Sequence, residues 1–215
     1  MTIRLLLKKL HLDNKRFLTS EILRKYCEEI DLNYTNTVNY LLRKGFLVRI
    51  FRGIFYLRSF DELKLAKTKY NHLELVAKGL KLKGVENWYF GLYTALKVKQ
   101  FDHEYFATAY VLNDKIFRAK AINIAGHRFK FHKISSKLLK FGIEEYDSKG
   151  ITLRYSNPEK TILDFIYIWR YNGISKDRII LDLKDYVKDL SSEKLFRYAL
   201  AYPKSVRSIA EELMG

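Results

Sequence analysis

Several polar side chains between residues 35 and 43 are of the kinds that read DNA bases. Asparagine can pair with adenine through two hydrogen bonds, arginine can do the same with guanine, and threonine can contact a thymine methyl group or a phosphate. The predicted base-reading residues are Thr35, Asn36, Asn39, Tyr40 and Arg43. The alternative is an ordinary solvated helix face in a module that contacts another protein.

Two arginines follow shortly after this group, on either side of a predicted tight turn. At such a turn a β-hairpin can lay Arg49 and Arg52 along the phosphates or into the minor groove. Three further cations, Lys44, Lys15 and Arg16, would add phosphate contacts if they face the DNA. Any one of them would otherwise be an ordinary surface charge.

Three predicted helices and a hairpin position these residues. Apolar spacing predicts helices over residues 2–11, 19–30 and 33–44, the third one capped by Asn33 and ended by Gly45. Residues 46–57 then change to a β-hairpin pattern. This order over residues 1–58 is typical of a winged helix-turn-helix, whose third helix enters the major groove.

The overall charge favours a polyanionic partner. The net charge is +16, from 40 Lys and Arg against 24 Asp and Glu, and the first 59 residues alone hold 12 basic and 5 acidic side chains. Nucleic acid is the first candidate and an anionic membrane surface the second. The longest uncharged run, residues 32–42, reaches only about half of a bilayer span. We expect no transmembrane segment, no signal peptide and no membrane partner, which predicts a cytoplasmic protein.

The remaining residues predict an α+β protein. A linking helix is expected over 61–82, within a linker at 59–84, and a further helix over 88–97. Strands follow at 105–112, 119–125, 128–134 and 151–155, forming a mainly antiparallel sheet. Asn157, Pro158 and Glu159 begin a helix, and a helical cluster ends the chain at about 175–189, 192–201 and 203–213. The predicted domains are 1–58, 59–84 and 85–215.

A second basic stretch, residues 115–143, contains no acidic side chain. On its predicted strand Arg128, Lys130 and His132 share one face, and Phe129 and Phe131 share the other. The candidate residues of this second basic surface are Arg118, Lys120, Arg128, Lys130, Lys133 and Lys137. Three interpretations stay open: this surface extends a DNA footprint, holds an acidic protein, or is solvated.

Catalytic patterns are weak. His103 with Glu104, and His127 with His132, do not have the spacing of metal ligands on a helix face, and no phosphate-binding loop or nucleophile elbow occurs. The single cysteine, Cys27, has the helical spacing of a core residue. We therefore expect no enzyme, metal or cofactor. The enzymatic alternative is a metal-dependent nuclease using Asp102, Glu144 and Glu145.

Three segments resemble the AbiEi family of antitoxins, which belong to type IV toxin–antitoxin and abortive-infection systems. They are residues 47–57, 89–96 and 155–164, and the last resembles the family's S-x-P-E-(K/R)-T-(L/I)-L-D motif. The resemblance implies an N-terminal winged helix that represses the protein's own operon, which we expect to occur through inverted repeats in the promoter. It also implies a C-terminal domain that counters a nucleotidyltransferase-like toxin. The alternative is a protein-interaction module without sequence-specific DNA binding.

Overall fold

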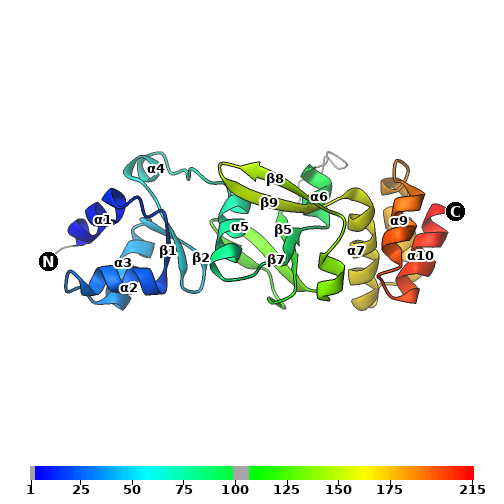
Figure 1. Cartoon of the computed structure of the whole chain (residues 1–215), viewed down its shortest axis with the longest axis horizontal. Coiled ribbons are helices and arrows are strands. Elements are labelled where there is room, and N and C mark those ends of the chain that lie inside the picture. The colour runs from blue at the N-terminus through cyan, green and yellow to red at the C-terminus, as the bar shows by residue number, and fades with distance from the viewer. Residues whose placement is uncertain (1–2, 99–106) are drawn as a thin grey trace. The chain divides into compact units, whose positions relative to one another are not determined.

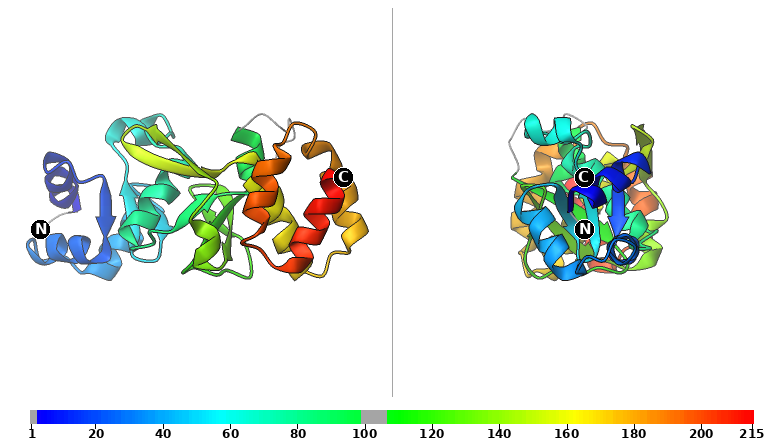
Figure 2. Two further views of the ribbon diagram at one scale, coloured as in Figure 1. Left: turned by 45° about the vertical axis from the view of Figure 1, so that its right-hand side comes forward. Right: turned by 90° about the vertical axis from the view of Figure 1, so that its left-hand side faces the viewer.

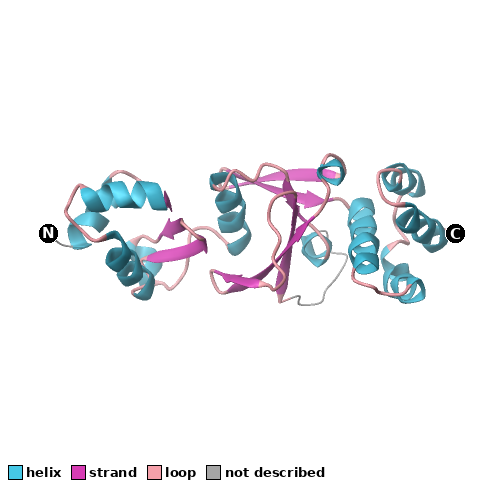
Figure 3. Cartoon of the chain, turned by 90° about the horizontal axis from the view of Figure 1, so that it is seen from below, coloured by secondary structure: helices cyan, strands magenta, loops and turns pink. Residues whose placement is uncertain are grey.

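The computed structural model describes residues 3–98 and 107–215, which form two compact units (Figure 1). The first unit contains the chain up to Glu86 together with residues 123–127 and 148–151. The second contains the remaining residues, from Asn87 onward. Both units combine helices and strands (Figure 3), so the protein is of the α+β class that its sequence predicts.

The first unit begins with three helices and a three-stranded sheet. Its elements in chain order are α1 (Ile3–Leu12), β1 (Phe17–Thr19), α2 (Ser20–Glu28), α3 (Tyr34–Arg43), β2 (Leu47–Phe51) and β3 (Ile54–Leu57). The sheet has the order β1-β3-β2, with both neighbouring pairs antiparallel. The three predicted helices and the hairpin are confirmed. Strand β1 was not predicted, because three residues are too few to show an alternating pattern.

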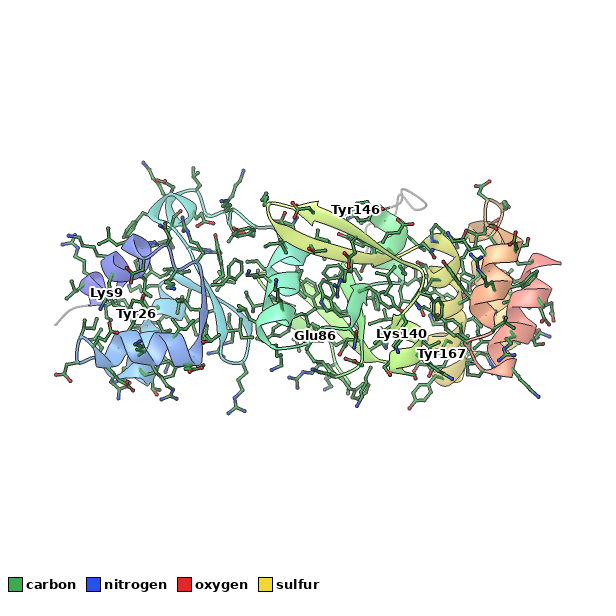
Figure 4. The ribbon with its side chains drawn as sticks, in the orientation of Figure 1. Lys9, Tyr26, Glu86, Lys140, Tyr146 and Tyr167 are labelled. Atoms are coloured by element: carbon green, nitrogen blue, oxygen red, sulfur yellow. The ribbon has the colours of Figure 1, made fainter. Side chains whose placement is uncertain are left out.

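Apolar side chains from all three helices and the sheet form the core of this unit. Leu10, Leu23, Leu41 and Leu57 are fully buried in it, and so is Cys27. This cysteine is therefore a core residue as expected, and its burial raises the pKa of the thiol. At the surface of this unit Lys9 on α1 lies near Tyr26 on α2, with 5.5 Å from Nζ to the ring centroid, and Figure 4 labels both residues.

The prediction of a single helix over 61–82 is wrong, because two helices occupy this segment. They are α4 (Phe60–Lys64) and α5 (His72–Leu82). Each has its own capping box, Ser59 with Glu62 and Asn71 with Glu74, so the second box starts a new helix. Helix α5 packs closely on β2, because a Cβ atom at Gly79 would lie only 2.5 Å from Ile50 Cγ2.

A six-stranded sheet of order β6-β7-β5-β4-β9-β8 belongs mostly to the second unit. Its strands are β4 (Trp88–Phe90), β5 (Thr108–Asn113), β6 (Ile122–Ile124), β7 (His127–Lys133), β8 (Ile143–Ser148) and β9 (Ile151–Ser156). Strand β4 pairs with β5 antiparallel, but β4 with β9 and β5 with β7 are parallel. The sheet is therefore mixed, with both parallel and antiparallel neighbours. Side-chain alternation shows which residues share a face and does not show which strands become neighbours.

The prediction of a helix over 88–97 is also wrong for its first residues. Residues 88–90 form β4, a fully buried strand at the centre of the sheet, and only α6 (Tyr93–Val98) is helical. Leu92 has a positive φ of 53°, which separates the strand from the helix. A run of three large aromatic residues suits a buried strand, but helical spacing fits it as well. Residues 105 and 106 of the strand predicted over 105–112 lie outside the described residues.

Helices complete the second unit. They are α7 (Pro158–Tyr171), α8 (Lys176–Leu183), α9 (Ser192–Ala199) and α10 (Lys204–Met214), with short 3-10 helices at Ser136–Leu139 and Lys184–Tyr186. The predicted start of α7 is confirmed: Asn157 caps it and Pro158 is its first residue. Its apolar side chains share one core with the sheet and with the last three helices, and α9 and α10 lie side by side (orange and red in Figure 2). In the described parts of the chain, no helix has the length and apolar character needed to cross a bilayer.

Candidate functional site

The outer face of α3 presents the predicted base-reading residues. Val38 and Leu41 on the opposite face are buried, and they fix the rotation of the helix about its axis. As a consequence Thr35, Asn36, Asn39 and Arg43 are exposed, while Tyr40 is half-buried. The side chain of Asn33 accepts a hydrogen bond from the Asn36 amide at 3.0 Å and so begins the helix directly before this face.

A shallow hollow of about 540 Å³ lies along this face of α3. Four of the five base-reading candidates line it, and Thr35 does not. The lining residues are Ile3, Leu32, Asn33, Asn36, Thr37, Asn39, Tyr40 and Arg43. No acidic side chain is among them. The hollow therefore combines amide donors and acceptors with one cation, which is the chemistry that base edges and phosphates require.

Tyr34 belongs to a different contact. Its ring lies beneath the Arg24 guanidinium, with 4.1 Å from Arg24 Cζ to the ring centroid, and its hydroxyl group donates to Ser20 Oγ at 3.0 Å. This side chain therefore joins α3 to α2. Tyr34 lies at the contact between these two helices.

The β2–β3 hairpin carries the two other predicted arginines, and both are exposed. The register shifts between Arg49 and Phe51, and Arg52 with Gly53 forms the turn. Gly53 has a φ of 78°, and its carbonyl group accepts a hydrogen bond of 2.8 Å from the Ser20 amide. The turn is thus fixed to the start of α2, and it holds Arg52 at an exposed tip.

Cations without acidic neighbours in the sequence extend across α3 and the hairpin. Between Asp31 and Asp61 the chain contains no acidic residue and five basic ones, which are Arg43, Lys44, Arg49, Arg52 and Arg58. Lys44 is exposed at the end of α3, and Lys15 is exposed after α1. Arg16 differs, since its Nη1 atom lies 3.3 Å from Glu62 Oε2 in a part-buried pair. It is therefore less available to a phosphate than the other cations.

The second basic stretch is not one flat face. Arg118 and Lys120 lie before β6, Lys137 lies in a 3-10 helix, and all three are exposed. On β7 the predicted alternation is confirmed, with Phe129 and Phe131 buried. Two groups on the opposite face of β7, Lys130 and His132, are half-buried, while Arg128 and the strand-end Lys133 are exposed. Lys130 Nζ donates a hydrogen bond to the Ala119 carbonyl oxygen.

Polar residues of the late motif, 155–164, are buried rather than exposed. Lys160 Nζ donates to the Leu138 carbonyl oxygen at 2.7 Å and lies 3.4 Å from Asp164 Oδ1. Asp164 also accepts hydrogen bonds from the hydroxyl groups of Tyr89 and Tyr202, at 2.7 and 2.6 Å. Burial lowers the pKa of Lys160 and raises that of Asp164, and the attraction between the two charges opposes both shifts. Sequence reasoning missed this pair, although its four-residue spacing on a helix could have indicated it.

The catalytic candidates that lie within the described residues have other partners. Glu145 pairs with Arg154 at 2.8 Å, and Glu144 accepts a hydrogen bond from Tyr146. His127 stacks on His72 with 3.8 Å between ring centroids, whereas His132 lies beside Tyr110. The other three candidates, Asp102, His103 and Glu104, lie outside the described residues. Within 3–98 and 107–215, no three His, Cys, Asp or Glu side chains are grouped so that they could hold a metal ion.

Comparisons with known proteins give a likeness of fold. No family model matches the chain, and no curated protein matches it. Among solved structures, the crystal structure of the RV2827C protein from Mycobacterium tuberculosis is similar, with a TM-score of 0.54 and 16% sequence identity. The match covers 97% of this chain and 74% of that one. At this identity the likeness concerns the fold alone, and it extends over both units.

Proposed function

We propose that this protein is a DNA-binding transcription regulator whose first unit is a winged helix-turn-helix. The observation that carries the proposal is the exposed polar face of α3, beside which the hairpin holds Arg52 at its tip. Helix α3 is the recognition helix in this proposal, and the β2–β3 hairpin is the wing. The partner is double-stranded DNA, and no cofactor or catalytic step is needed.

The order of elements supports this interpretation. The series α1, β1, α2, α3, β2, β3, with a short strand β1 paired to the hairpin, has the helix-turn-helix followed by a hairpin that such domains use. In this arrangement the N-terminal residues of the third helix meet base edges. Asn36 and Asn39 lie there, and Arg43 follows one turn later on the same face.

The distribution of polar and charged side chains supports different roles for the helix and the wing, with bases read by α3 and phosphates bound by the hairpin. Amide side chains on α3 can select adenine, and Arg43 can select guanine, through paired hydrogen bonds. Arg49 and Arg52 can bind phosphates, which adds affinity for any sequence. Because no acidic residue occurs between Asp31 and Asp61, no carboxylate within this segment repels the DNA backbone.

The biological role that we propose is that of an AbiEi-type antitoxin. The protein would act in the cytoplasm, repress its own operon through inverted repeats and counter a nucleotidyltransferase-like toxin. Support comes from the resemblance of residues 47–57, 89–96 and 155–164 to that family. The toxin part is tested by co-expression with a neighbouring nucleotidyltransferase-like gene. Growth arrest that this chain does not relieve would remove the antitoxin role and leave the DNA-binding role standing.

A binding experiment tests DNA recognition directly. Gel-shift titrations and footprinting at physiological salt would compare the DNA upstream of the protein's own gene with random sequence. We expect Asn39→Ala and Arg43→Ala to reduce the discrimination between the two by about 1–3 kcal/mol. Lys204→Ala removes an exposed cation from α10 in the second unit. It is the control and should leave the discrimination between promoter and random DNA unchanged.

Two results would oppose the proposal. Footprints of both α3 variants equal to that of the wild type would mean that α3 does not read bases. Random DNA bound as tightly as the promoter would instead favour a protein-interaction module, in which the first unit does not recognise sequence.

A further inference from the structure

Two adjoining hollows lie in the second unit between the sheet and α7. They measure about 350 and 700 Å³, within the size range of small-molecule sites. Lys130 and His132 on β7, and Ile168 and Asn172 at the end of α7, line both of them. The larger hollow extends toward Tyr167, which Figure 4 labels on α7.

The charge of the lining selects anions. Arg128, Lys130 and Lys133 are among the lining residues, and no Asp or Glu of the described residues lines either hollow. The guanidinium group of Arg128 forms no hydrogen bond and no ion pair with any described residue. A guanidinium group in this state can bind the oxygens of a phosphate through two parallel hydrogen bonds.

The smaller hollow is also lined by aromatic rings. The rings of Tyr110 and His132 are nearly parallel, 13° apart, with centroids separated by 6.1 Å. The ring centroids of Tyr93 and Tyr110 are 5.9 Å apart. Trp169 on α7, which is half-buried, also lines this hollow. Burial lowers the pKa of His132 to about 4, and the charge of Lys130 adds to this shift, so that the ring is uncharged near pH 7. Uncharged aromatic rings are surfaces on which nucleobases stack.

The register between β5 and β7 places the cations beside the aromatic rings. Strands β5 and β7 are parallel, with Thr108 opposite Arg128 and Tyr110 opposite Lys130. A cation and an aromatic ring therefore stand side by side on the face that is turned toward α7. The Asn172 side chain, which can donate and accept hydrogen bonds as a base edge requires, lines both hollows from the opposite side.

We propose that these hollows bind a nucleoside monophosphate. Its phosphate would lie against Arg128 and Lys130, and its base would stack on the rings that line the smaller hollow. The size of the hollows and the three cations among their described lining residues favour this ligand class over an uncharged aromatic molecule. The proposal concerns the second unit alone and does not depend on DNA binding by the first.

Titration calorimetry of the full chain tests the proposal. The probes are AMP, GMP, CMP and UMP, with adenosine, guanosine and inorganic phosphate as fragments. We expect saturable binding of one nucleotide per chain for at least one monophosphate. The corresponding nucleoside, and phosphate alone, should bind at least about tenfold more weakly, because each fragment lacks one of the two contacts. Quenching of Trp169 fluorescence, against the buried Trp88, gives a second readout.

Matched variants locate the site. Arg128→Gln should weaken nucleotide binding about tenfold or more. Arg118→Gln is the control and should not weaken it, because it makes the same change at an exposed arginine that lines neither hollow. Arg118 and Arg128 are both exposed, so these two variants should keep the wild-type melting temperature.

Three outcomes would overturn the proposal. The first is no saturable binding of any monophosphate at millimolar concentration. The second is equal weakening by Arg128→Gln and Arg118→Gln, which would indicate general attraction to a basic protein. The third is Arg128-dependent binding of a single-stranded oligonucleotide without binding of any mononucleotide, which would make this face a strand-binding surface instead.

Discussion

Lys160 Nζ lies 3.4 Å from Asp164 Oδ1, and both side chains are completely buried. The two residues are one turn apart on α7. Tyr89 from β4 and Tyr202, just before α10, both donate to the Asp164 carboxylate, while Lys160 donates to the Leu138 carbonyl oxygen. This pair therefore joins α7 to the sheet, to a 3-10 helix and to the C-terminal helices. Its burial means that this part of the late motif serves the fold.

We expect the loss of either partner to destabilise the second unit strongly. Asp164→Asn leaves the Lys160 ammonium group buried without a counter-charge, and Lys160→Met leaves the carboxylate unpaired. Each should lower the free energy of unfolding by about 3–5 kcal/mol. The double variant should lose clearly less than the sum of the two, because neither charge then stays unpaired. Urea unfolding followed by circular dichroism measures all three.

An exposed pair of the same spacing is the control for that cycle. Arg178 and Asp182 on α8 are also four residues apart, with 2.8 Å between Nε and Oδ2, but the arginine is mostly exposed. Arg178→Met should cost at most about 0.5 kcal/mol. If the effects of Asp164→Asn and Lys160→Met simply add, the two buried groups do not stabilise each other and the interpretation is wrong.

Arg52→Ala should weaken DNA binding without changing which sequence is preferred. The turn residue contacts phosphates in the proposed complex, so affinity for promoter and random DNA should fall by the same factor. The slope of log affinity against log salt concentration should decrease by about one, because one counterion fewer is released. Titrations at three or four salt concentrations give the slope. A loss confined to the promoter would show instead that Arg52 reads sequence.

Stability should depend on pH through His132. Its pKa is lowered from 6.5 to about 4, chiefly by burial. Above pH 6.5 the folded and unfolded states both hold a neutral imidazole. Between pH 6.5 and 4 the unfolded state takes up a proton that the folded state does not, so stability is lost as pH falls through this window. Unfolding of the wild type and His132→Phe at intervals from pH 7.5 to 4.5 should show a shallower decline in the variant. Parallel curves would contradict the prediction.

Local interactions explain why much of the first unit, and of the α3 site, could be predicted. Asn33 and Asn157 cap their helices with hydrogen bonds to amides three residues away, so their effect is readable from neighbouring residues. The periodic apolar residues of α3 determine its buried face, and the exposed polar face with Asn39 and Arg43 follows from it. In the same way, alternation along β7 determined which side chains share a face with Arg128.

Only the tertiary structure decided which distant segments became neighbours. Residues 88–90 become a central strand because β5 and the distant β9 pair with them on either side, and no nearby residue encodes those partners. The burial of Lys160 and Asp164 depends on tyrosines from two other elements, and the hollow beside Arg128 exists because α7 packs across β5 and β7. Such contacts depend on packing between segments far apart in the chain, whereas caps and periodicity act over a few residues. The sequence by itself therefore determined the three helices and the hairpin of the first unit, the start of α7 and the exposed face of α3. The mixed sheet, the buried ion pair and the second candidate site came from the fold.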